Sequence, residues 1–290
     1  MSKDYIIFTD ASADVTLNIS EENDVHFIEM PCESEGNIYN CTGTDSDEKI
    51  KQFYTDIRTG ALPKTTQITP FQYEEIFSPY LEEGKDIIYL SLSSGLSSTF
   101  ESSKLAAETL NAKYENAKLY TVDSIAATGG MGILVERMIY NRGRGLNAAE
   151  NAADIEEVKH HIYTSCYVED LHHLKRGGRI GAAAAAIGSL LNLKPIIKIT
   201  EDGTLESKDK CRGAKKAVLY LVDKYKEFGD MDDPTPIYIS DADNAAMADF
   251  MEEEVKKVNP KVVIHRARLS PIIGTHLGPE STLISFMMKR

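Results

Sequence analysis

Short apolar runs alternate with amphipathic segments along the first half of the chain. The runs YIIFTD (5–10), DIIYLSLS (86–93) and KLYTVDS (118–124) have the length and composition of buried strands. Helical patterns occupy the intervals, at 46–60, at 70–84, from about residue 98, and at 128–141. Because strands that alternate with helices form parallel sheets covered on both faces, we predict an N-terminal three-layer α/β domain with a mostly parallel sheet.

Two further strand-like segments, 24–33 and 37–42, flank Glu35 and Gly36. A glycine turn between two such segments predicts a β-hairpin. We expect this hairpin, near 24–42, to be an insertion in the N-terminal domain.

The second half has a different pattern. The segment 194–213 predicts a hairpin around Asp202-Gly203, and 170–194 predicts two helical pieces broken at Gly177-Gly178. The remaining strands are expected at 161–169, 235–243, 261–270 and 282–290, and amphipathic helices at 213–229 and 244–259. Hairpins mixed with helices favour a C-terminal α+β domain with a largely antiparallel sheet. We place the domain junction in the polar, glycine-containing segment 141–161, which predicts domains at 1–158 and 159–290.

The composition is that of a globular chain of 290 residues, long enough for two medium domains. Its formal net charge of −13 argues against nucleic acid or an anionic membrane as the main partner, since both select basic surfaces. No segment approaches the roughly 20 apolar residues of a transmembrane helix, and no signal peptide is visible at the start. The four cysteines have no CxxC spacing, which is typical of reduced thiols and predicts a cytoplasmic protein.

Polar side chains, most of them neutral hydroxyls, follow several predicted strands, where ligands bind in open α/β sheets. They are Thr9, Asp10, Ser12, Ser91, Ser93, Ser94, Ser97, Asp123 and Ser124, with Thr65, Thr66, Gln67 and Thr69 in a separate loop. Each alone is explained by a helix cap or a turn. The recurrence at four places favours a site for one small anionic or hydroxylated group.

The stretch SSGLSSTF (93–100) contains three of these hydroxyl residues. Ser98 and Glu101 fit a capping box, which leaves Ser93, Ser94 and Ser97 beside a helix N-terminus that favours an anion. The stretch lacks the G-x-S-x-G of a nucleophile elbow, and the chain lacks a Walker A string. VDSIAATGGMG (122–132) is rich in glycine without matching G-x-G-x-x-G.

His276 lies in GTHLGP, which predicts a rigid loop between two strands and makes it a binding candidate together with Thr275. The pairs His160-His161 and His172-His173 are poor metal sites, because adjacent side chains point in different directions and no carboxylate or cysteine has ligand spacing. We expect no metal and no cofactor.

Eight motifs occur in the order seen in the DegV family. They are TDASADVT, TTQITP, SSGLSSTF, VDS, LKRGGRIG, LLNLKPIIKITEDG, KCRGAKKA and SPIIGTHLGP. The chain resembles this family over essentially its whole length. The resemblance implies two domains with a long-chain fatty acid between them. It also implies a non-catalytic subunit that presents the fatty acid carboxylate to a separate ATP-dependent fatty acid kinase subunit, which makes an acyl phosphate for phospholipid synthesis.

The resemblance carries roles to particular residues. Thr66 and Ser97 would hydrogen-bond the carboxylate, and His276 would complete the network. The implied carboxylate-binding set is Thr66, Ser94, Gly95, Ser97, Thr275 and His276. Arg179 and Arg212 match arginines that dock the kinase subunit, a role that suits the planar guanidinium. We expect the apolar segments 187–197 and SFMMK (285–289) to line the acyl chain.

The chain departs from the family pattern at a few positions. Ala11 replaces a serine of the first motif, Thr66 replaces a serine and keeps its hydroxyl, Ser98 replaces a glycine, and Glu280 replaces the glycine that follows GP. These changes leave the carboxylate site intact and concern chain-length preference and kinase pairing.

Two other functions are compatible with the residue types. A serine hydrolase would use Ser94 or Ser97 as nucleophile, His276 as base, and Asp123 or Asp10 to orient it. A binding module for a small hydroxylated metabolite would use His276 as a substrate-binding group.

Overall fold

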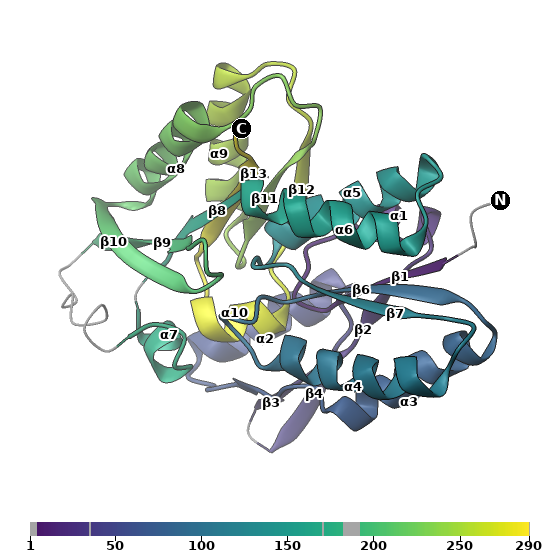
Figure 1. The fold of residues 1–290 in the computed structure, drawn as a ribbon. Coiled ribbons are helices and arrows are strands. Elements are labelled where there is room, and N and C mark those ends of the chain that lie inside the picture. Colours follow the sequence, from purple (N-terminus) through teal and green to yellow (C-terminus); the bar gives the residue numbers. More distant parts are fainter. Residues whose placement is uncertain (1–4, 35, 170, 182–191, 290) are drawn as a thin grey trace.

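The computed structural model describes residues 5–34, 36–169, 171–181 and 192–289. The first half forms a parallel sheet in the order β2-β1-β6-β7, as the alternation of strands and helices predicts. Its strands are β1 (Tyr5–Asp10), β2 (Val25–Ile28), β6 (Asp86–Ser91) and β7 (Leu119–Asp123). Helices cover both faces, with α5 (Gly129–Gly143) and α6 (Ala148–Val158) on one and α3 (Pro70–Glu82) and α4 (Thr99–Lys113) on the other (Figure 1). A short helix, α1 (Leu17–Glu22), packs beside β2.

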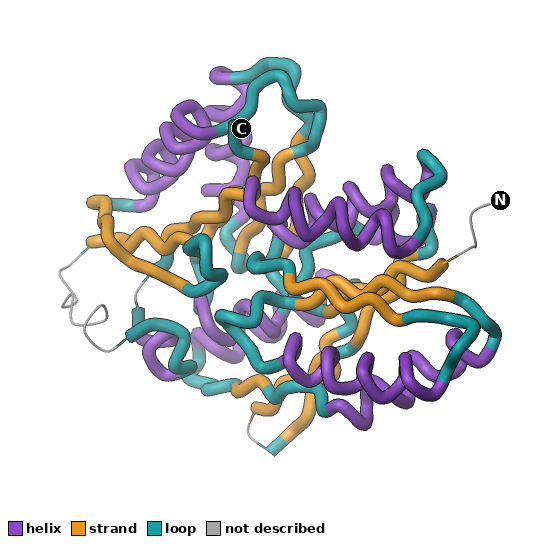
Figure 2. The backbone as a smooth tube through the Cα atoms, in the orientation of Figure 1, coloured by secondary structure: helices purple, strands orange, loops and turns teal. Residues whose placement is uncertain are grey.

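The second half forms a six-stranded sheet in the order β10-β9-β8-β13-β11-β12. Its strands are β8 (Ile162–Tyr167), β9 (Leu193–Ile199), β10 (Leu205–Arg212), β11 (Ile237–Asp241), β12 (Ile264–Arg268) and β13 (Thr282–Met287). Only the β11–β12 pair is parallel, which confirms the largely antiparallel prediction. Helices α8 (Ala214–Phe228) and α9 (Ala245–Val258) pack against this sheet, and Figure 2 shows both sheets among their helices.

Helix α5 also contacts β8, β11 and β13, so it packs between the two sheets. The glycines of VDSIAATGGMG allow this close approach, because a Cβ at Gly129 would lie 2.3 Å from Cβ of Tyr238. The glycine-rich string therefore serves helix packing.

A third, small sheet corrects the hairpin prediction. Strands β3 (Met30–Ser34) and β4 (Asn37–Cys41) form the expected antiparallel pair, and β5 (Lys64–Thr65) adds to it. The prediction of one strand over 24–33 is wrong, because this range contains two strands: β2 belongs to the parallel sheet and β3 to the small sheet. Val25, Ile28, Met30 and Cys32 are all buried, so the apolar pattern continues across the break without marking it.

The remaining elements are α2 (Asp47–Arg58), the 3₁₀ turn η1 (Lys159–His161), α7 (His172–Arg176) and α10 (Pro271–Leu277). The loop predicted around His276 is wrong, because this residue lies in the last turn of α10. The second helical piece predicted after Gly177-Gly178 falls largely on 182–191, outside the described residues. The domain boundary after residue 158, where α6 ends, stays a prediction.

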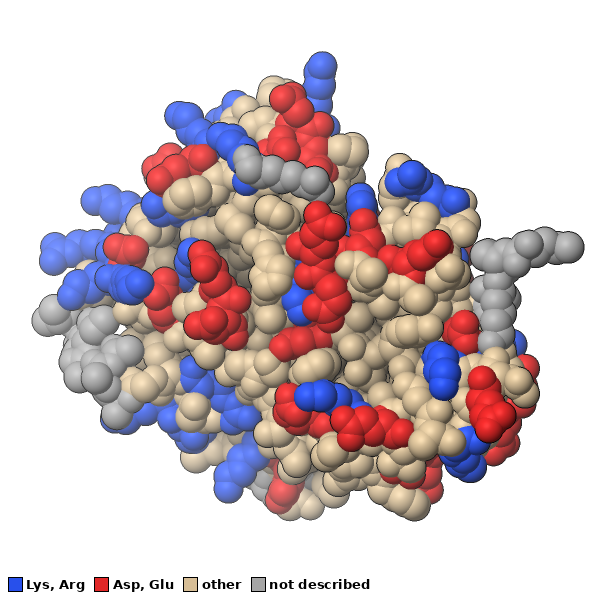
Figure 3. All heavy atoms as spheres, viewed as in Figure 1, with Lys and Arg blue, Asp and Glu red and all other residues tan. Residues whose placement is uncertain are grey.

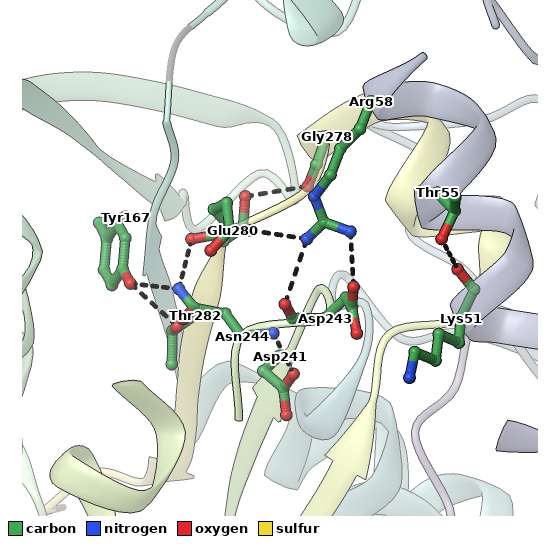
Figure 4. Close-up of polar contacts among 11 residues, drawn as sticks. Lys51, Thr55, Arg58, Tyr167, Asp241, Asp243, Asn244, Gly278, Glu280 and Thr282 are labelled. Carbon is green, nitrogen blue, oxygen red and sulfur yellow. Dashed lines mark hydrogen bonds and ion pairs between the residues drawn. The ribbon is translucent and has the colours of Figure 1, made fainter. Parts of the chain in front are cut away.

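An ion-pair network joins elements that are distant in the sequence (Figure 4). Nη1 of Arg58, at the end of α2, lies 2.5 Å from Oδ2 of Asp243, and its Nη2 lies 2.6 Å from Oε1 of Glu280. Asp243 precedes α9, and Glu280 precedes β13. Asp243 therefore lies in the loop between β11 and α9, and Glu280 in the loop between α10 and β13, so Arg58 ties the N-terminal half to two loops of the second half.

Within the described ranges, no helix is long and apolar enough to cross a membrane. That part of the chain also holds no group of three His, Cys, Asp or Glu side chains arranged to bind a metal ion. The four cysteines are free thiols, and all but the half-buried Cys211 are buried.

Candidate functional site

A cavity of about 270 Å³ lies between the two sheets. The loop after β6, the start of α5, strands β8, β9, β10 and β13, and helices α7 and α10 all contribute to its wall. Most of the wall is apolar, including Leu92, Leu174, Ile197, Ile272 and Leu283. Among the described residues, no acidic side chain lines it. An apolar wall with a few grouped polar side chains is typical of a small-molecule site.

One end of this wall is polar and open to solvent. We call it the polar mouth and define it by Thr66, Gln67, Ser97 and Ser98. Thr66, Gln67 and Ser98 are exposed, and Ser97 is half-buried. A ligand group held there is therefore accessible from outside the protein.

The polar mouth is assembled from distant segments. The amide of Thr66 donates to the carbonyl of Pro31 at 3.2 Å, which extends the β3–β5 pairing. Beside it, Oγ1 of Thr65 lies 3.0 Å from Nε2 of His276. The structure thus brings Thr66, Ser97 and His276 to one cavity, and it adds Thr65, whose partnership with His276 no local pattern indicates.

The capping role predicted for Ser98 is wrong. Ser98 occupies the position before α4, but its side chain makes no capping bond, because its backbone (φ −76°, ψ 7°) is not extended as a capping residue requires. Ser97 accepts from the amide of Thr99 at 3.2 Å instead, and its hydroxyl lies 2.7 Å from that of Thr99. Ser98 is left free to line the cavity.

Three candidate residues lie outside the cavity wall. Ser94 is exposed, and its amide donates to Oδ1 of Asp123 at 3.1 Å. Gly95 packs on the β9–β10 turn, where a Cβ would lie 2.7 Å from the carbonyl oxygen of Gly203. Thr275 is buried, and its hydroxyl donates to Pro271 O at 2.8 Å. These residues hold the loop after β6 and helix α10 in place.

Most of the other hydroxyls at strand ends are bound internally. Thr9 donates to Leu90 O at 3.1 Å, Ser93 donates to Gly203 O at 2.8 Å, and Ser124 donates to Ala126 O at 3.0 Å. These hydroxyls recur along the sequence because they bind backbone carbonyls, so their recurrence alone does not indicate a ligand.

His276 is neutral at physiological pH. Burial, followed by the positive charges of Arg179, Arg176 and His173, lowers its pKa to about 4. Its Nδ1 is buried and has no hydrogen-bond partner among the described residues. A neutral imidazole at this place can donate or accept a hydrogen bond without adding charge to the site.

This shift predicts a pH dependence of folding. Because the folded pKa of His276 lies below the unfolded value, its contribution to stability is present above about pH 6.5 and is lost as the pH falls toward 4. Between pH 7.5 and 5 we expect a loss of about 2 kcal/mol from this residue. Urea unfolding of the wild type and of His276→Gln at both pH values measures it.

The comparison with the variant is needed because Asp14 acts in the opposite direction. Burial raises the pKa of Asp14 from 3.8 to about 7, so its contribution to stability is lost as the pH rises from about 4 to about 7 and does not change further above that. His276→Gln leaves Asp14 unchanged. If the wild type and the variant respond to pH in the same way, the assignment to His276 is wrong.

The geometry gives no support to a serine hydrolase. Among the described residues, Nε2 of His276 is bonded to Thr65, and neither Ser94 nor Ser97 is bonded to the imidazole. Asp123 accepts from the amides of Ser94 and Ile125. A nucleophile, base and orienting acid in mutual contact, as the mechanism requires, are not assembled in this part of the chain.

The two candidate docking arginines lie in different places. Arg179 lines the cavity, and its Nε donates to Leu96 O at 3.1 Å, so it supports the loop after β6. Arg212 is exposed at the end of the edge strand β10. Figure 3 shows Lys and Arg side chains gathered over β10 and the start of α8, and the exposed cations there are Lys208, Lys210, Arg212, Lys215 and Lys216.

The model of the DegV family, described as an uncharacterised protein family, matches residues 5–289. The chain belongs to the DegV family. The DegV domain-containing protein CPE0026 of Clostridium perfringens is 33% identical to it over 285 residues, which cover 98% of each chain. The DegV domain-containing protein YteA of Lactococcus lactis is 30% identical, over 98% of this chain and 97% of its own.

Solved structures of DegV proteins have the same fold. Protein TM841 of Thermotoga maritima, for which a fatty acid binding function is described, superposes with a TM-score of 0.83 at 26% identity. The comparison covers 98% of this chain and 99% of that one. A fatty-acid-binding DegV protein of Thermus thermophilus gives a TM-score of 0.85 at 26% identity, over 99% and 100% of the two chains.

Proposed function

We propose that this DegV protein binds a long-chain fatty acid, with the carboxylate at the polar mouth and the acyl chain in the apolar cavity. One observation carries the proposal: the cavity is largely apolar, and the exposed side chains among its described lining residues, Thr66, Gln67 and Ser98, are neutral and polar. The fatty acid binding described for the Thermotoga maritima and Thermus thermophilus proteins supports it.

The carboxylate would accept hydrogen bonds from the hydroxyls of Thr66 and Ser97 and would contact the Thr65–His276 pair. Hydrogen bonds to a charged group contribute roughly 1.5–3 kcal/mol each, so a few of them hold a carboxylate without a lysine. The other members of the proposed set, Ser94, Gly95 and Thr275, act by fixing the backbone around these groups.

The acyl chain would provide most of the affinity. Transfer of each CH₂ from water to an apolar wall yields about 0.8 kcal/mol. Ile197 lies in this wall as the sequence indicates, whereas 187–191 lie outside the described residues. The prediction that SFMMK lines the same cavity is wrong, because Phe286 packs in the core of the six-stranded sheet and Met288 lines a separate cavity.

We further propose that the protein is not a catalyst and presents the carboxylate to a separate ATP-dependent kinase subunit. The open polar mouth supports this, since a second protein can reach a group held there. We expect Arg179 beside the mouth and Arg212 on β10 to dock that subunit.

Native mass spectrometry of the purified protein tests the binding proposal. We expect a copurified long-chain fatty acid, and we expect the delipidated protein to take up palmitate or oleate. A protein that is empty and binds neither would overturn the proposal.

Removing the polar mouth should weaken binding. Thr66→Val with Ser97→Ala is expected to raise the Kd for palmitate by about 150-fold or more, since two charge-assisted hydrogen bonds of roughly 1.5–3 kcal/mol each are lost. Titration calorimetry measures the Kd. Thr109→Val removes an exposed hydroxyl on α4 that is bonded only to Leu105 O, and it is the matched control. Equal affinities in the double variant and the control would place the carboxylate elsewhere.

The kinase proposal has its own test. With palmitate and Mg-ATP, we expect acyl phosphate only when a bacterial fatty acid kinase catalytic subunit is added. Arg212→Glu should weaken binding of that subunit while leaving palmitate binding intact, because Arg212 lies away from the cavity wall. Acyl phosphate formed by the chain alone would contradict a non-catalytic role.

A further inference from the structure

The imidazole of His276 lies between two backbone segments. Its Nε2 lies 3.0 Å from Oγ1 of Thr65, which the pairing of β5 with β3 holds opposite Cys32. Its Nδ1 faces Gly177, the residue that follows α7. A Cβ built on Gly177 would lie 2.3 Å from Nδ1 and 2.9 Å from Cε1 of the ring. The imidazole therefore occupies the space that a side chain at residue 177 would need.

The backbone does not require a glycine at residue 177. Gly177 has φ of −72° and ψ of −9°, a right-handed conformation that any residue adopts. Its amide donates to His173 O at 2.9 Å, as in a continuing helix. The next residue, Gly178, has the left-handed φ of 70° that is common just after a helix. The contact with His276, and not the backbone, therefore accounts for the glycine at residue 177.

Helix α7 is held in place, so it cannot withdraw to make room for a larger residue. Leu174 of this helix is fully buried, and Nε of Arg179 donates to the loop after β6 at 3.1 Å. A reciprocal contact joins α7 to α10, because a Cβ at Gly278 would lie 2.5 Å from Cδ2 of His173. Each helix thus places a histidine against a glycine that follows the other helix. A side chain at Gly177 would displace the imidazole before it displaced the helix.

We propose that Gly177 is a positioning residue for the carboxylate site and acts through His276. This inference rests on the proposed function and adds a residue to its site. With no side chain at residue 177, the imidazole keeps the orientation in which Nε2 meets Thr65 beside the polar mouth. Alanine would force the ring to move by about 1 Å to restore an ordinary van der Waals contact, and the bond to Thr65 would be lost.

The first test compares laurate with dodecanol, which have the same number of carbons and differ in the head group. Titration calorimetry on the delipidated full-length protein measures both Kd values. In Gly177→Ala we expect the Kd for laurate to rise about tenfold, which corresponds to one charge-assisted hydrogen bond. The Kd for dodecanol should change by less than about twofold, because an alcohol makes no charge-assisted bond. Equal weakening of both ligands would overturn the inference, since it would indicate a general distortion of the cavity.

A double variant tests whether the effect passes through the imidazole. His276→Ala removes the ring, so adding Gly177→Ala to it should weaken laurate binding no further. A further tenfold loss in that background would contradict the proposal. The double variant also covers the case in which Gly177→Ala folds poorly, because it lacks the clash and should fold as His276→Ala does. If it does not, the contact assigned here is wrong.

A ligand-free measurement separates this inference from the proposed function. The ring nitrogen resonances of His276, identified by their loss in His276→Gln, are recorded by ¹⁵N NMR. They should move in Gly177→Ala and stay in place in Gly143→Ala, the matched control. Gly143 is exposed at the end of α5, and nothing lies within 4 Å of an added Cβ. Unchanged resonances in Gly177→Ala would overturn the positioning role, whereas a wild type that binds no laurate would overturn the proposed function.

Discussion

Replacing Asp10 by alanine is expected to lower the free energy of unfolding by about 3–5 kcal/mol. Its carboxylate is completely buried and accepts from the amides of Ser12 and Leu92 at 3.0 and 2.9 Å. The hydroxyl of Tyr89 donates to it at 2.9 Å, and that of Ser12 also donates to it. Alanine would leave these donors buried without an acceptor. Urea unfolding at pH 7, followed by circular dichroism, measures the change.

Two variants separate this effect from a general loss of charge. Asp10→Asn keeps one oxygen acceptor but places an amide opposite the donors, so an intermediate loss is expected. Asp249→Ala removes an exposed carboxylate that pairs with Arg266 and should change stability by less than about 1 kcal/mol. A loss of similar size in Asp249→Ala and Asp10→Ala would refute the role assigned to the buried hydrogen bonds.

Gly203→Ala is expected to destabilise the protein by about 2–4 kcal/mol. Gly203 lies in the turn between β9 and β10 with φ of 72°, where a Cβ is strained. That Cβ would also lie 2.1 Å from Oγ of Ser93, which donates to the carbonyl of Gly203. The substitution therefore costs backbone energy and separates the turn from the loop after β6.

Gly84→Ala is the matched control for this prediction. Gly84 has a similar φ of 77°, but nothing lies within 4 Å of the added Cβ. Only the backbone cost of about 1 kcal/mol is expected there. Thermal unfolding of both variants, with palmitate titration of the folded protein, separates strain from contact. If the two substitutions cost the same, the contact between the turn and the loop contributes nothing.

The fold was largely predictable because short stretches of sequence, through their apolar periodicity and turn residues, indicate most of its strands and helices. The hairpin around Asp202-Gly203 and the alternation of strands and helices in the first half both form as the sequence indicates. The errors occur where one local pattern fits two structures. The apolar pattern of 24–33 runs through a change of sheet, and GTHLGP has the residues of a loop although Pro271 begins a helix.

The candidate site was less predictable because its decisive contacts join distant segments. Thr65 meets His276 across 211 positions of sequence, and no periodicity encodes that contact. Ser97, and not Ser98, makes the bond to the first residue of α4, because of the backbone conformation at residue 98, which the residue types do not reveal. Thr164 and Ser165, which also line the cavity, did carry a signal, as two hydroxyl residues in an otherwise apolar buried strand.

The ion pair between Arg58 and Glu280 restricts which residues positions 58 and 280 can hold. Glu280 has φ of 65°, a left-handed backbone conformation that favours glycine. Glycine is the residue that the family pattern has at this position. The ion pair with Arg58 helps to hold Glu280 in this conformation, together with the hydrogen bonds from its amide to Ala242 O and from Nδ2 of Asn244 to its carbonyl. If Arg58 were lost, the best residue at position 280 would again be glycine. Positions 58 and 280 should therefore vary together among relatives, with arginine and glutamate appearing as a pair.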